Sequence, residues 1–67
     1  MTFLNFMELY DDWNRNIKVN DDNLNPIIEG MAVDIMLPYG DLYNSKIMDK
    51  EVISFGYYNN TLCIRIK

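Results

Sequence analysis

The chain has 67 residues, 49% of them hydrophobic and nine of them aromatic (one Trp, five Tyr and three Phe), which suffices for one small folded domain over residues 1–67 and excludes a second core. Ten acidic residues against six basic residues give a net charge of −4, which argues against direct binding to nucleic acid. Histidine is absent and Cys63 is the only cysteine, so an internal disulfide and the common zinc patterns are excluded, and a reducing, cytoplasmic setting is expected.

The N-terminal segment is predicted to form an amphipathic helix from about residue 3 to about residue 14. Thr2 is a suitable N-cap, and the residues after it carry an apolar stripe at three- and four-residue spacing, made of Phe3, Phe6, Leu9, Tyr10 and Trp13. Asp11 and Asp12 fall in the last turn, where acidic side chains oppose the helix dipole. The segment lacks a positively charged start and polar residues interrupt it, so we expect neither a signal peptide nor a membrane span.

The first strand is predicted at residues 17–19, because Ile17-Lys18-Val19 alternates apolar and polar side chains. It runs into Asn20-Asp21-Asp22-Asn23, a cluster of residues that favour turns. Pro26 has no N–H for a central ladder, so residues 24–26 should form a loop or an edge, with Ile27 and Ile28 opening the next element.

Residues 31–37 (MAVDIML) suit either a buried strand or a helical turn, and their branched side chains favour a strand. Gly30 before them permits a bulge or a bend. Pro38 and Gly40 end the segment, and Asp41 can cap a short helical turn over residues 42–45.

The C-terminal residues are predicted to form a hairpin closed by Asn59-Asn60, because asparagine tolerates the positive φ angles of a type I′ turn. This turn pairs residues whose numbers sum to 119. One face then carries only large apolar pairs, 57 with 62, 55 with 64 and 53 with 66, while the other carries 58 with 61, 56 with 63, 54 with 65 and 52 with 67. The predicted fold is therefore α+β, with one N-terminal helix on an antiparallel sheet of three or four strands that ends in this hairpin.

Catalytic chemistry has little support in the sequence. No histidine is available as a base, and no nucleophile elbow or phosphate loop is recognisable. Cys63 falls on the polar face of the hairpin, opposite Gly56, without a partner to activate its thiol. We therefore expect no catalytic residue and no cofactor, although paired carboxylates could in principle serve acid and base chemistry on a sugar.

A calcium loop is the metal site that the sequence comes nearest to. Asp21, Asn23 and Asn25 stand at the first, third and fifth positions of an EF-hand pattern. The glycine and the final glutamate of that pattern are replaced by Pro26 and Ala32, so we expect a solvated acidic turn and no metal site.

The tail EVISFGYYNNTLCIRIK, preceded by the Ile17-Lys18-Val19-Asn20-Asp21 segment, resembles short uncharacterised proteins of bacterial phages and mobile elements, many of which end in an apolar hairpin. Small acidic proteins of that origin include anti-CRISPR inhibitors, some of which present carboxylates to a basic nucleic-acid channel. The resemblance implies an inhibitor that binds a nucleic-acid-handling protein, and it transfers no signature residue to this chain.

The sequence thus favours a non-enzymatic domain that docks acidic and tyrosine side chains on a basic surface of a partner protein. The candidate partner-binding residues are Asp11, Asp12, Asp21, Asp22, Tyr39, Asp41 and Tyr43. For the tyrosines the alternative is that they cover the open end of a small core. For the whole protein it is a structural or regulatory accessory that works as a homodimer or larger homo-oligomer, through the edge of its last strand or its remaining aromatic residues.

Overall fold

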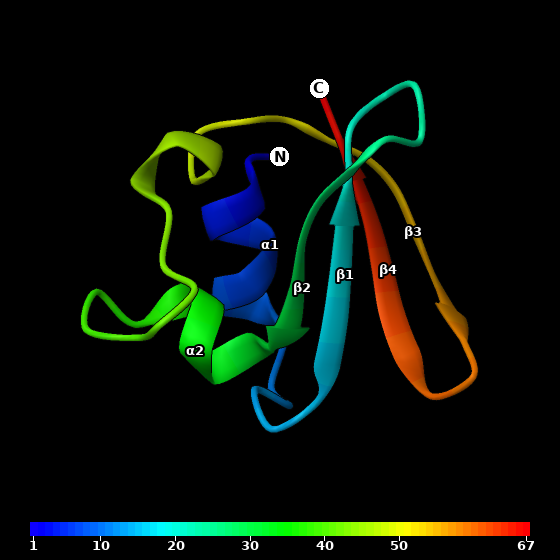
Figure 1. Ribbon diagram of the computed structural model, residues 1–67. Coiled ribbons are helices and arrows are strands. Elements are labelled where there is room, and N and C mark those ends of the chain that lie inside the picture. Colours follow the sequence, from blue (N-terminus) through cyan, green and yellow to red (C-terminus); the bar gives the residue numbers. More distant parts are fainter.

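Four strands form one sheet, and a short N-terminal helix packs on one of its faces (Figure 1). The computed structural model describes residues 1–67. Its elements are the helices α1 (Phe3–Leu9) and α2 (Ala32–Met36), the 3-10 turn η1 (Ser45–Ile47), and the strands β1 (Asn16–Asn20), β2 (Pro26–Met31), β3 (Val52–Tyr58) and β4 (Thr61–Ile66). None of the helices has the length and apolar character needed to cross a membrane.

The strand order is β2-β1-β4-β3, with β1 antiparallel to β2, β3 antiparallel to β4, and β1 parallel to β4. The predicted α+β class, the N-terminal helix and the C-terminal hairpin are confirmed. The prediction of a wholly antiparallel sheet is wrong at its centre, where β1 and β4 run in the same direction. The last strand therefore has a neighbour on each side, and the free edges belong to β2 and β3.

Helix α1 begins as predicted but ends early. The Thr2 side chain accepts a hydrogen bond from the Asn5 N–H at 3.1 Å, which caps the first turn. The helix stops at Leu9, before the two acidic residues that would oppose its dipole. Trp13 lies outside the helix and its indole N–H donates to the Met7 carbonyl at 2.9 Å, so a predicted stripe residue packs on the helix from the following loop.

The β1–β2 connection is a turn that Asp21 holds with its own side chain. Its carboxylate accepts the backbone N–H groups of Asn23 at 2.9 Å and Asn25 at 2.8 Å. Hydrogen bonds from the Asn25 amide, and then from the Asn23 amide, lower the pKa of Asp21 despite some loss of hydration. The carboxylate thus stabilises the turn. Pro26 is the first residue of β2, which is an edge strand, where a missing N–H is tolerated.

The strand predicted over residues 31–37 is wrong, because residues 32–36 form the helix α2. Ala32, Ile35 and Met36 are buried on its inner side, at the three- and four-residue spacing of a helix. The helical turn predicted over residues 42–45 lies later, at η1. Its cap is Asn44, whose side chain accepts the Lys46 N–H at 3.0 Å, and not Asp41.

The hairpin register is confirmed from the turn to Ser54. Asn59 and Asn60 have φ angles of 52° and 63°, as a type I′ turn requires, and 58/61, 57/62, 56/63, 55/64 and 54/65 are paired. The pairing then shifts, so that Val52 faces Ile66, and the predicted pairings of 53 with 66 and of 52 with 67 are wrong. A second register shift lies in the β1–β2 pair, between Val19 and Asn20. Gly30, where the sequence permitted a bulge or a bend, pairs regularly with Ile17.

The core is small and one-sided. It consists of twelve buried residues, Phe3, Met7, Ile17, Val19, Ala32, Ile35, Met36, Ile47, Met48, Leu62, Ile64 and Ile66. On β4 every second residue is buried, as predicted. On β3 the equivalent side chains stay largely in solvent, with Phe55 61% and Tyr57 54% exposed. The outer strand of the hairpin therefore supplies the interior with much less than its sequence pattern indicated.

Candidate interaction surfaces

The two predicted aspartate pairs lie at opposite ends of β1. Asp11 and Asp12 precede the strand, and Asp21 and Asp22 follow it. In Figure 1 the segment before β1 lies at the lower end of the sheet and the β1–β2 turn at the upper end. The structure thus separates the two pairs, so the predicted residues do not form one continuous surface.

Backbone hydrogen bonds place the segment that follows Asp11 and Asp12 beside the start of α2. The segment after them accepts two bonds from the start of α2, Val33 N–H to the Trp13 carbonyl and Ala32 N–H to the Arg15 carbonyl, both at 2.9 Å. The Asp34 carbonyl in turn accepts the Leu42 N–H at 3.3 Å. The segment after Asp12 and the segment of Asp41 therefore each contact α2, and we call the carboxylates of these three segments, Asp11, Asp12, Asp34 and Asp41, the acidic face.

Most carboxylates of the protein have no cationic partner. Asp12 lies 3.2 Å from the Arg15 guanidinium, and Glu51 lies 3.8 Å from the N-terminal ammonium. The other eight of the ten have no cation within 4.0 Å, and none of the ten residues is buried. The negative charge therefore remains available at the surface.

The tyrosines proposed for partner binding differ in their surroundings. Tyr39 is 83% exposed, in the loop after α2. Tyr43 is half-buried and packs against the core cluster, as the alternative interpretation of the tyrosines expected. The ring of Tyr39 is therefore accessible to a partner without rearrangement, whereas part of the Tyr43 ring is covered by the core.

A second surface lies where α1 meets β3, and we call it the aromatic patch: Met1, Phe6, Leu9, Tyr10, Phe55 and Tyr57. The rings of Phe6 and Phe55 are 4.9 Å apart between centroids, and Phe6 stacks on Tyr10 at 6.4 Å. Leu9 is 71% exposed and Met1 58%. The sequence predicted Leu9 on the buried stripe of the helix and Phe55 and Tyr57 on the inner face of the hairpin. The patch was not predicted, because these side chains are exposed only when β3 is an edge strand, and the strand order decides that.

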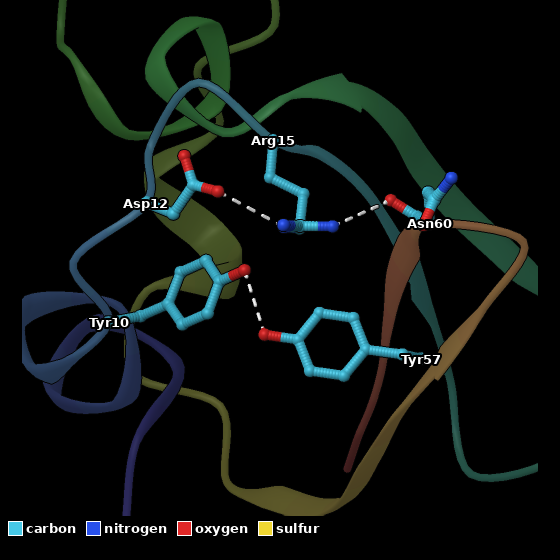
Figure 2. Close-up of polar contacts among 5 residues, drawn as sticks. All are labelled: Tyr10, Asp12, Arg15, Tyr57 and Asn60. Carbon is cyan, nitrogen blue, oxygen red and sulfur yellow. Dashed lines mark hydrogen bonds and ion pairs between the residues drawn. The ribbon is translucent and has the colours of Figure 1, made fainter.

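Polar contacts surround Tyr10 and Tyr57 of the patch (Figure 2). The Tyr57 and Tyr10 hydroxyls share a hydrogen bond of 2.9 Å, and the Arg15 guanidinium lies 5.2 Å from the centre of the Tyr57 ring. Arg15 also donates through Nε to Asp12 at 3.2 Å and through Nη1 to the Asn60 carbonyl at 3.1 Å. These contacts join the end of α1 and the following loop to the tip of the hairpin.

This arrangement predicts an alkaline transition. Partial removal of Tyr10 from water, followed by its hydrogen bond and charge interaction with Tyr57, raises the pKa of Tyr10 from 10.0 to about 12. Because the folded state favours the neutral phenol, the stabilisation is complete below pH 10 and disappears as the pH rises through about 12. We expect the free energy of unfolding, measured with denaturant, to fall between these two pH values.

The Tyr57→Phe variant tests the origin of that transition, since it removes the shared hydrogen bond and leaves the ring. The difference in tyrosinate absorbance between this variant and a Tyr10→Phe, Tyr57→Phe double variant isolates the titration of Tyr10. We expect Tyr10 to titrate at a lower pH in the Tyr57→Phe variant than in the wild type. An unchanged Tyr10 titration would mean that Tyr57 does not contribute to the shift.

The sheet face away from α1 carries a third feature, a groove of about 600 Å³ over β1, β4 and β3. The charged residues that line it are Lys18 and Arg65. Cys63 lies in it beside Gly56, as the hairpin register predicted, and is half-buried. The Arg65 Nε and the Asn20 Oδ1 are buried there without a hydrogen-bond partner. The groove thus has the opposite charge to the acidic face.

Comparison of the chain with family models, curated proteins and solved structures finds no match.

Proposed function

We propose that this protein is a non-enzymatic binding domain that docks its acidic face on a basic surface of a partner protein in the cytoplasm. The observation that supports this most directly is that eight of ten carboxylates have no cation within 4.0 Å and that none of the ten is buried. Uncompensated surface charge of one sign steers association with a surface of the other sign. The free thiol of Cys63 is consistent with a reducing compartment.

Proteins that handle nucleic acid are the partner class we propose. Their binding channels carry clustered Lys and Arg that neutralise backbone phosphates, and carboxylates can occupy the same cationic groups. The acidic face offers its carboxylates from three adjoining segments, and the exposed ring of Tyr39 lies between Asp34 and Asp41 in the chain. Tyrosine beside charge is a common composition for a binding surface, because the ring contributes area with little loss of entropy. The action would be inhibition, as the resemblance of the tail to phage and mobile-element proteins, which include anti-CRISPR inhibitors, implies.

A pair of triple variants with equal charge tests the proposal. Asp11→Asn, Asp34→Asn, Asp41→Asn removes charge from the acidic face, and Asp22→Asn, Glu29→Gln, Asp49→Asn removes it elsewhere; each changes the net charge from −4 to −1. Both sets leave Asp21 and Asp12 in place, because these two make short hydrogen bonds within the fold. Glu29 accepts only a 3.5 Å contact from the Asn16 amide, and glutamine at this position keeps an oxygen acceptor for it. Circular dichroism should show the wild-type fold for both.

The wild type, immobilised, is used to capture its partner from host lysate, and the partner is then titrated against all three proteins. At about 0.2–1 kcal/mol per exposed charge pair, the acidic-face variant should bind roughly tenfold more weakly, and the control variant close to wild type. Binding should also weaken as salt rises from 0.05 to about 0.5 M, since screening shortens the range of the charges. A partner that is retained at high salt, or lost equally from both variants, would contradict docking through the acidic face.

A further inference from the structure

The two free edges of the sheet differ in how they are protected. Edge strands usually carry charge, proline or a bulge that prevents pairing with another chain. Strand β2 has Pro26 and Glu29, and its pairing with β1 is bulged near its start. Strand β3, with the sequence VISFGYY, has neither a charged residue nor a proline. Its start is covered, because the Val52 N–H donates to the Met1 carbonyl at 2.8 Å and Thr2 bridges Glu51. Its pairing with β4 is irregular only there, so the stretch Ser54–Tyr58 is the regular and unprotected part of the edge.

Hairpin geometry gives the direction of the backbone groups on that edge. The residues that flank a two-residue turn exchange both of their hydrogen bonds, and the pattern alternates along an antiparallel ladder. Tyr58, Gly56 and Ser54 therefore bond to β4, and the N–H and C=O groups of Phe55 and Tyr57 face away from the sheet. These are also the residues whose rings are 61% and 54% exposed. The edge thus offers backbone groups and apolar area at the same two positions.

We propose that a second copy of this chain occupies the edge, with β3 pairing antiparallel to β3 across a two-fold axis at Gly56. The regular stretch Ser54–Tyr58 is centred on that residue. In this register Phe55 of each copy pairs with Tyr57 of the other, which satisfies the outward backbone groups in two hydrogen-bonded pairs. The two sheets become one sheet of eight strands, with both α1 helices on the same face.

The composition of β3 favours a second copy over a partner of another kind. Every cross-strand pair in this register is uncharged, Phe55 with Tyr57, Ser54 with Tyr58 and Gly56 with itself, so the segment is complementary to itself despite a net charge of −4 per chain. The aromatic patches of the two copies meet on the α1 side and extend a core of only twelve buried residues. Because β2 is protected, assembly ends at the dimer instead of continuing into a filament.

Oligomeric state is the first test. Analytical ultracentrifugation of the full chain should show a mass near twice 8.0 kDa that dissociates on dilution. Phe55→Lys places a charge at the interface, and at a hot-spot position the dissociation constant should rise at least about 30-fold. The matched control is Tyr39→Lys, on a residue 83% exposed and outside β3, which should remain a dimer. Higher salt should leave the dimer unchanged or strengthen it, because the two copies have the same net charge.

A cysteine cross-link tests the register. In the Cys63→Ser background, Gly56→Cys should form an intermolecular disulfide with oxidised glutathione, because residues opposite each other in a non-hydrogen-bonded pair have Cα atoms about 4.5 Å apart. A Cβ at Gly56 meets only ordinary contacts with the Tyr58 ring. The matched control is Ser54→Cys, on the same strand and face, whose two copies would lie about 14 Å apart along the strands and should not cross-link.

Several results would overturn the proposal. They are a monomer at all concentrations, a Phe55→Lys variant that dimerises like the wild type, assembly beyond the dimer, or equal cross-linking at residues 54 and 56. Capture of another protein by β3 in place of a second copy would also do so. Docking through the acidic face has a separate readout, since the neutral variants of Asp11, Asp34 and Asp41 leave β3 unchanged, so either proposal can fail while the other stands.

Discussion

Replacing Phe3 with alanine is expected to remove most or all of the stability of this protein. Phe3 is fully buried, and its N–H donates to the Lys50 carbonyl at 2.7 Å while the next residue donates to Met48, so α1 is fixed to the segment before β3 through this position. Truncation of a buried phenylalanine costs about 3–5 kcal/mol. A domain of this size has roughly 5 kcal/mol in total.

Urea unfolding followed by circular dichroism measures that loss, and Phe55→Ala is the matched control. Phe55 is the same residue type at 61% exposure, so its truncation should cost less than about 1 kcal/mol. The measurement should be made at low protein concentration, so that association through β3 does not contribute to the measured free energy of unfolding. Equal losses from the two variants would mean that β3 contributes to the core as fully as α1 does.

Replacing Gly40 with alanine is expected to have the second largest effect. A Cβ at this position would collide with the backbone carbonyl of Asp34, and the Cα of that residue is also within 3 Å. Backbone atoms of a short helix cannot rotate away as a side chain can, so the loop after α2 must move. The cost should be about 1–3 kcal/mol, which lowers the Tm of a domain of this size by roughly 5–20 °C.

Gly30→Ala is the control for that substitution. Its Cβ would collide with the terminal Cδ1 of Leu42, which is the end of a flexible side chain and can change rotamer. Thermal unfolding should therefore show a smaller loss for Gly30→Ala than for Gly40→Ala. Because Tyr39 and Asp41 flank Gly40, its substitution should also weaken docking through the acidic face, while Gly30→Ala should not. A reversed order of the two Tm values would mean that the backbone around Gly40 yields more easily than the Leu42 side chain.

The parts of the fold that were predicted correctly depend on local chemistry. Asn59-Asn60 specifies its turn through the φ angles that asparagine accepts, and the turn then fixes the hairpin register by counting. Thr2 caps α1 because its hydroxyl reaches the Asn5 amide, whatever the rest of the chain does. Ile17 and Val19 are buried as their alternation indicated.

The errors have causes that lie outside the local sequence. Residues 32–36 carry branched side chains that suit a strand, but the connection from the β2 edge lets Ala32, Ile35 and Met36 reach the core as a single helical turn. Phe55 and Tyr57 have the pattern of a buried strand, and they are exposed because the β1–β4 pairing makes β3 an edge. No spacing within β3 encodes that pairing.

For the candidate surfaces, the sequence likewise indicated the residue types but not which segments lie side by side. Asp11 and Asp41 were recognised as acidic residues near tyrosines, but only the contacts of α2 show that their segments adjoin. Asp34 was missed because an extended segment would have placed its carboxylate differently. Asp21 was assigned to a partner, and its hydrogen bonds to Asn23 and Asn25 show a role in the turn.

The parallel contact between β1 and β4 has a consequence for how the chain reaches its native state. It joins two antiparallel halves, β1–β2 and β3–β4, through pairs such as Ile17 with Leu62, which are distant in the chain. Each half can close locally in microseconds, but the inner strand of each is left with one side unpaired until the halves meet. Their encounter must overcome the closure entropy of the intervening loop, so it should set the folding rate, and a fragment that lacks either half should remain unfolded.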